Sequence, residues 1–135
     1  MSNVTPRDEE YNFDESVIIS QTDLDGVITY VNRAFCKVSG YNSDELIGEP
    51  HNIVRHPDMP STVFEKMWNA ISNGRAWNGL LKNLRKSGEF YWVDIEILPT
   101  KDNEENITGY ISVSKPASHK DIQENEEIYK KMLEA

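Results

Sequence analysis

Five stretches of this chain, either rich in β-branched residues or alternating between apolar and polar positions, predict five β-strands. Two short β-branched runs, residues 17–20 and 27–31, flank an Asp-Gly turn and predict a hairpin. Three further runs, residues 77–84, 90–98 and 107–113, follow one another across short turns and predict an antiparallel meander. The strand-forming residues are therefore divided between two parts of the chain, with a region of different character between them.

The region between the hairpin and the meander has helical spacing. Asn32 is a candidate N-cap for a short helix that ends at Gly40, and Asn42 with Glu45 matches a loose capping box for a second short turn. Residues 118–135 are charged and helix-forming, so a further helix is expected there. A longer helix before the meander is predicted by one apolar stripe at positions i, i+3, i+4 and i+7, which consists of Phe64, Met67, Trp68 and Ile71.

The loop at residues 51–60 gathers the candidate chemistry. Pro57 and Pro60 disfavour helical geometry at the residues before them, which predicts a rigid, kinked loop. Thr62 and Glu65 have capping-box spacing and predict that a helix starts at this point. A stiff polar loop that leads into a helix N-terminus suits an anion or a polar ligand, whereas the alternative is a charged surface that only faces water. Its ionisable side chains are His51, Arg55, His56 and Asp58.

The composition narrows the function classes. The chain has 135 residues, enough for one domain, and its 14 Lys and Arg residues against 23 Asp and Glu residues give a formal charge of -9. This charge disfavours nucleic acid and anionic membranes as partners. The single cysteine, Cys36, allows no internal disulfide and fits a reducing compartment. No apolar run approaches the roughly 20 residues of a membrane span, so we expect a cytoplasmic protein that does not insert into a membrane.

The predicted order of strands and helices resembles that of a PAS domain over residues 17–115. Residues 1–16 would then be an N-terminal cap, and residues 116–135 a C-terminal helix or linker. The resemblance implies an α+β fold in which short helices pack on one face of a five-stranded antiparallel sheet. The residues that carry it are the Asp-Gly turn with Asn32-Arg-Ala-Phe35, Ser39-Gly-Tyr41 with Glu45-Leu-Ile-Gly48, the Lys-Ser-Gly turn before Tyr91-Trp92, and Ile107-x-Gly109-Tyr110-Ile111.

A second set of motifs is more specific. It consists of Pro50-His-Asn-Ile-Val-Arg-His-Pro-Asp-Met-Pro60, Phe64-x-x-Met67-Trp68 and Trp77-x-Gly79-x-x-Lys82-Asn83. This combination resembles the sensory PAS domain of bacterial aerotaxis receptors. The resemblance implies a redox or energy sensor that binds FAD non-covalently and signals to the chemotaxis machinery by a conformational change. The matching positions that are tied to FAD binding or signalling in that family are Arg55, His56, Asp58, Trp68 and Asn83.

The chemistry of FAD makes these assignments reasonable, because its site needs aromatic walls, a few placed hydrogen bonds and local positive charge. Trp68 and Trp77 are candidates to stack on the ring. Asn83 is expected on the same strand face as Gly79, where a missing side chain would leave room for the ring, and its amide can both donate and accept a hydrogen bond. The alternatives are ordinary core packing for the two tryptophans and a solvated position for Asn83. The cationic candidates are Arg55 and His56.

Other functions remain open from the sequence. A haem-binding PAS oxygen sensor usually takes its iron ligand from the helix before the meander, but residues 61–73 contain no histidine, which leaves only His51 and His56. A blue-light flavin photosensor needs a cysteine just before Pro57, and none is there. An enzyme is not expected, because no nucleophile accompanies the loop. A cofactor-free interaction or dimerisation module is the last alternative. The expected partner is a chemoreceptor or HAMP-type signalling protein or domain, with a homodimer as a further option.

Overall fold

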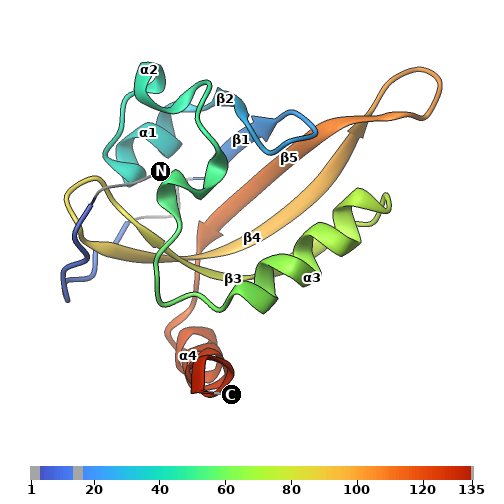
Figure 1. Cartoon of the computed structure of the whole chain (residues 1–135). Coiled ribbons are helices and arrows are strands. Elements are labelled where there is room, and N and C mark those ends of the chain that lie inside the picture. The colour runs from blue at the N-terminus through green and yellow to red at the C-terminus, as the bar shows by residue number, and fades with distance from the viewer. Residues whose placement is uncertain (1–3, 14–16, 135) are drawn as a thin grey trace.

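The computed structural model describes residues 4–13 and 17–134. Its five strands form one antiparallel sheet in the order β2-β1-β5-β4-β3 (Figure 1). The hairpin therefore joins the meander through pairing of β1 with β5, and β3 is an edge strand. The bounds are Ile18–Thr22 for β1, Ile28–Val31 for β2, Trp77–Leu84 for β3, Phe90–Lys101 for β4 and Ile107–Pro116 for β5.

The helices divide between the two faces of this sheet. The segment between β2 and β3 contains α1 at Arg33–Ser39, α2 at Ser43–Leu46, the short 3₁₀ helix η1 at His51–Val54 and α3 at Ser61–Ser72. These helices cover one face, as the sequence predicts. The long α4, His119–Glu134, packs on the opposite face through Tyr129, whose ring stacks on Trp92. None of the helices in the described part of the chain is long and apolar enough to cross a bilayer.

Two predicted helix starts are confirmed, and one is wrong. The Asn32 side chain accepts a hydrogen bond from the Phe35 amide at 3.0 Å, and Asn42 and Glu45 form a full capping box. The predicted box at Thr62 does not form, because α3 begins one residue earlier, at Ser61. Its N-cap position is Pro60, which has no side-chain donor or acceptor, and Thr62 is already inside the first turn.

The expected loop at residues 51–60 is more regular than its prolines suggested. Its first four residues form the 3₁₀ turn η1, which follows Pro50 and ends before Arg55. The prolines at positions 57 and 60 restrict only their own neighbours, so they leave these four residues free to be helical. The remainder of the loop is extended or turn-like, as predicted.

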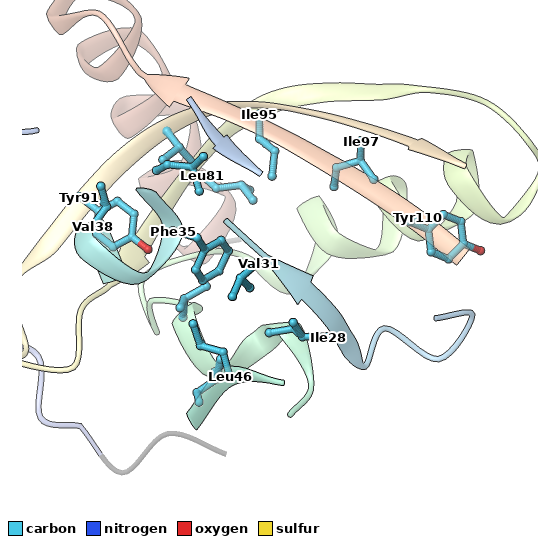
Figure 2. Packing of buried hydrophobic residues seen from close by; sticks show 14 of the residues in the cluster. Ile28, Val31, Phe35, Val38, Leu46, Leu81, Tyr91, Ile95, Ile97 and Tyr110 are labelled. Atoms are coloured by element: carbon cyan, nitrogen blue, oxygen red, sulfur yellow. The ribbon is translucent and has the colours of Figure 1, made fainter. Parts of the chain in front are cut away.

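The core lies between the helical layer and the sheet face that the helices cover. Figure 2 shows buried side chains of β4 and β5 pointing toward those of α1, α2 and β2. The apolar stripe of α3 faces this core, with Met67 and Ile71 buried and Trp68 at its border. The labelled core residues are Ile28, Val31, Phe35, Val38, Leu46, Leu81, Tyr91, Ile95, Ile97 and Tyr110.

Residues 4–13 of the predicted N-terminal cap run along the β3–β4 turn. The Arg7 amide donates to the Gly88 carbonyl at 2.8 Å, and the Tyr11 amide donates to the Phe90 carbonyl at 2.7 Å. The ring of Phe13 meets Tyr91 edge-on at 6.0 Å between centroids. The acidic residues 14 and 15 of the same cap lie outside the described residues.

Candidate functional site

A cavity of about 390 Å³ lies between the helical layer and the sheet. Its walls come from α1, η1, α3 and every strand except β2. One apolar wall is formed by Phe64, Met67 and Ile71 of α3 and another by alternate residues of β4, which are Val93, Ile95 and Ile97. Such a slot, with two apolar walls from separate elements, has the shape that a flat ring system requires.

The part of the cavity wall that belongs to β1 and β5 is polar and is built from small residues. Ser20 pairs with Ser112 across the two strands, and Ser114 follows on the same face. All three serines are buried. The hydroxyl of Ser20 lies 3.0 Å from Nε2 of His51, whereas those of Ser112 and Ser114 have no hydrogen-bond partner among the described residues. A ligand edge that carries hydrogen-bonding groups would find partners here.

His51 completes this polar wall from the helical side. Its ring meets Phe35 edge-on at 5.7 Å between centroids and bonds to Ser20 across the cavity wall. Withdrawal of the imidazole from water lowers the pKa of His51. Because no charged group opposes this effect, the neutral ring is the stable form near neutral pH, and it can both donate and accept a hydrogen bond.

Arg55 and Asn83 enter the cavity wall together. The two residues form an isolated antiparallel β-bridge, which joins the middle of the loop to edge strand β3. The Arg55 guanidinium lies 4.0 Å above the centre of the Phe64 ring, and this contact holds a positive charge beside the apolar wall. Burial raises the pKa of Tyr91, while a hydrogen bond with the Asn83 side chain acts in the opposite sense. Asn83 is therefore a cavity residue and not a solvated one.

Trp68 stands where the cavity wall meets the β1–β2 turn. Its indole is 36% exposed and contacts the Tyr110 ring edge-on at 5.5 Å. On its other side, a Cβ added to Gly26 would lie 3.1 Å from the indole. Gly26 also has a φ of +83°, so the turn needs glycine both for its backbone and for this close approach. The indole position depends on this turn.

Three predicted site residues lie outside the cavity lining. The His56 ring is buried against the edge of Phe90, and Asp58 pairs with Lys82 at 3.0 Å. Trp77 lies over Gly79, where an added Cβ would come within 2.5 Å of the indole. The space beside Gly79 that was expected to admit a ligand ring is thus filled by Trp77 itself. The expectation was wrong because a side chain two residues away on the same strand face reaches a glycine more readily than a ligand does.

The pKa values of His56 and Asp58 in the loop are both lowered from their ordinary values. Burial, and after it the charge of Lys82, lower the pKa of His56, while Asp58 acts in the opposite direction. Partial burial favours protonation of Asp58, but the ion pair with Lys82 outweighs it and lowers the pKa of Asp58. His56 is therefore held neutral beside an ionised Asp58. The Nδ1 atom of His56 accepts a hydrogen bond from the Asp58 amide at 3.0 Å.

The sequence interpretation missed the serines of the cavity wall and the pairing of His51 with Ser20. The local signal for the serines pointed the other way. Ser112 and Ser114 alternate with the apolar residues Ile111 and Val113, and such alternation alone would place the serines on the solvent-facing side of the strand. A strand that places serines on its inward face leaves space in the core. The pairing of His51 with Ser20 had no local signal, because the two residues are 31 positions apart.

The sheet order, the helical layer on one face and the cavity between them define the class of protein. The model of the PAS fold matches residues 14–116, so the chain belongs to the PAS family.

Among PAS domains, the relatives most informative about this chain belong to receptor and regulatory proteins. The aerotaxis receptor of Escherichia coli (strain K12) is 44% identical over 117 residues, which cover 87% of this chain and 23% of the receptor. The nitrogen fixation regulatory protein of Klebsiella pneumoniae is 31% identical over 103 residues, which cover 76% of this chain and 21% of that protein. The chain thus spans less than a quarter of these relatives.

A solved light-oxygen-voltage domain studied with a flavin analogue is also similar. Its TM-score is 0.71 at 26% identity, with 84% of this chain and 87% of that chain covered. The chain is a PAS sensor domain related to the aerotaxis receptor and to light-oxygen-voltage domains.

Proposed function

We propose that this domain binds FAD non-covalently in its cavity and acts as a cytoplasmic redox sensor whose state is passed to the chemotaxis machinery. The observation that carries the proposal is the cavity of about 390 Å³, with apolar walls and a polar serine and histidine wall, in a chain 44% identical to an aerotaxis receptor. A chemoreceptor or HAMP-type protein or domain would receive the signal.

The residues of the cavity fit a flavin ring. The cavity volume lies within the range of about 300–1,000 Å³ that is usual for small-molecule sites. The α3 and β4 walls would exclude water from the faces of the ring, while Ser112, Ser114 and Asn83 would bond to its polar edge. Arg55 brings positive charge to a protein of net charge -9. Bound FAD would supply reversible electron uptake, which ordinary side chains lack.

The same residues suggest how the sensor would report its state. The side-chain amide of Asn83 can exchange donor and acceptor roles, and the Asn83 backbone is bridged to Arg55 in the middle of the loop. A changed hydrogen bond at Asn83 would therefore shift β3 and the loop together. A preference of about 1 kcal/mol between two conformers is roughly fivefold in population, and one rearranged hydrogen bond is of that size.

The structure gives less support to the alternatives. For haem, His56 does not line the cavity, and the Nε2 atom of His51 is already bonded to Ser20. For a photochemical sensor, Cys36 would have to reach the cavity, and no cysteine belongs to the cavity lining among the described residues. A cofactor-free interaction module would have no need of a cavity lined by the hydroxyls of Ser112 and Ser114, which have no hydrogen-bond partner among the described residues.

The test is the visible absorption of the freshly purified protein, followed by heat release and chromatographic identification of the chromophore. The two absorption bands of an oxidised flavin, with FAD in the released fraction, are expected. A single intense haem band, or a protein that stays colourless after incubation with FAD, would refute the proposal.

Variants of the cavity wall connect the chromophore to this site. Trp68→Ala and Arg55→Gln should each give a folded protein that retains little FAD. Arg75→Gln is the matched control, because this arginine is exposed and lies outside the cavity lining. Equal FAD content in all three variants would show that the flavin is held elsewhere.

A further inference from the structure

We propose that Lys82 is a positioning residue of the cavity: its ion pair with Asp58 clamps the loop onto edge strand β3 and so holds Arg55 and Asn83 in the cavity wall. The clamp consists of Lys82, Asp58 and His56. The expected effect of the clamp on ligand affinity rests on the proposed FAD binding. Its effect on the position of the loop is independent of any ligand. Lys82 itself lies outside the cavity lining.

Lys82 contacts the loop through both its side chain and its backbone. Its Nζ atom lies 3.0 Å from Oδ2 of Asp58 and 4.5 Å from the centre of the Phe90 ring. Its backbone amide points at the Met59 sulfur at 3.3 Å. The Lys82 side chain is only 13% exposed, so it is held in place rather than moving freely in solvent. An ordered, half-desolvated lysine over an aromatic ring makes a stronger contact than an exposed surface pair.

His56 fastens the same loop through two further contacts. Its buried ring rests on the edge of Phe90, the ring that Lys82 also contacts. Its Nδ1 atom accepts the amide proton of Asp58, which fixes the turn that presents the Asp58 carboxylate to Lys82. His56 and Asp58 therefore act through the position of the loop, without lining the cavity themselves.

The clamp lies next to the cavity residues in sequence but on the other face of the strand. Successive side chains of a strand point to opposite faces, so Lys82 is directed toward the loop side while Asn83 is directed into the cavity. The loop residue next to His56 is Arg55, whose backbone is bridged to Asn83. Releasing Asp58 from Lys82 would therefore loosen the bridge that places both cavity groups.

The experiment is a charge exchange between the two residues. Asp58→Lys and Lys82→Asp each place like charges together, and the double variant restores an opposite pair. Each single variant should weaken FAD binding roughly tenfold, within the usual range of coupling between neighbouring elements, and the double variant should recover most of the loss. A neutral variant, Lys82→Gln, removes the ion pair without adding a repulsion. Its control is Lys86→Gln, since Lys86 pairs with Glu45 of α2 instead of with a loop residue.

Hydrogen exchange of the backbone amides of Arg55, His56, Asp58 and Met59 gives a second measurement that needs no flavin. Exchange should rise in Lys82→Gln and stay unchanged in Lys86→Gln. If the wild-type protein binds no FAD, the proposed function is refuted. The hydrogen-exchange comparison would still show whether Lys82 holds the loop in place. Wild-type FAD affinity in Lys82→Gln with unchanged exchange would overturn the clamp, as would a double charge exchange that rescues neither measurement.

Discussion

Filling the cavity from its serine wall should stabilise the ligand-free protein, and this outcome distinguishes a real cavity from a tightly packed core. The perturbation is Ser112→Leu. Ser112 is buried, lies on the cavity wall and has no hydrogen-bond partner among the described residues. Replacing it therefore breaks no hydrogen bond within the protein and directs apolar atoms into open space.

The magnitude follows from the added atoms. The leucine side chain has about two more non-hydrogen atoms than that of serine, and burial of each added carbon group contributes about 0.8 kcal/mol. Ordering the leucine side chain costs roughly 0.5–1 kcal/mol. The net gain in unfolding free energy is thus about 1 kcal/mol, which corresponds to a rise in melting temperature of roughly 3–5 °C for a domain of this size. Flavin retention should fall at the same time, because the leucine occupies the space of the ligand.

The matched control is Ser39→Leu. Ser39 is also fully buried, but it lies outside the cavity lining and its hydroxyl accepts the Tyr41 amide proton. Leucine there should overpack the core and cost about 1–3 kcal/mol. Both variants are measured without flavin by thermal or urea unfolding, because a bound ligand would add its own stabilisation. If Ser112→Leu destabilises the protein as much as Ser39→Leu, the cavity is not open and the reasoning fails.

Three further outcomes follow from other contacts. Trp77→Phe should leave FAD content unchanged, because this indole covers Gly79 and does not line the cavity; loss of FAD would return Trp77 to the site. The pKa values of His51 and His56 are lowered by burial. Their contribution to stability is therefore complete above about pH 6.5 and is lost as the pH falls through the lower folded-state values, so unfolding midpoints should drop on acidification and drop less in His56→Gln. Tyr129→Phe should cost about 0.5–1.5 kcal/mol of α4 docking, because its hydroxyl donates to the Leu80 carbonyl at 2.6 Å, and faster exchange in α4 with an unchanged core would confirm this.

The features predicted correctly are those that residues near in sequence decide. Asn32 caps α1 because the amide that it bonds is three residues away, and the same holds for the capping box of Asn42 and Glu45. The alternation of Tyr91 with its neighbours fixes which face of β4 is buried, since strand side chains alternate regardless of the partner strand. Local chemistry and strand geometry predicted the individual elements, whereas their arrangement into one sheet with a helical layer was predicted from the resemblance to a PAS domain.

The features that the sequence did not reveal depend on contacts between distant residues. Lys82 and Asp58 are 24 positions apart in the sequence, and no pattern in either segment predicts that their side chains form an ion pair. The clustering of Arg55, His56 and Asp58 in one loop suggested one common role. The structure separates them, because only Arg55 reaches the cavity while the other two fasten the loop. Residue type and proximity in sequence do not decide on which side of a loop a side chain lies.

Edge strand β3 connects the three parts of the molecule that a signal would have to involve. Asn83 faces the cavity, Lys82 holds the loop, and the carbonyl of Leu80 accepts the hydrogen bond of Tyr129 in α4. The three residues lie within four positions of one edge strand, whose single strand neighbour among the described residues is β4 and whose other edge carries only the bridge from Asn83 to Arg55. A strand with one neighbour can shift with the loss of fewer ladder hydrogen bonds than a central strand. A displacement of β3 driven from Asn83 would therefore reach both the loop and α4 without a change in the rest of the sheet.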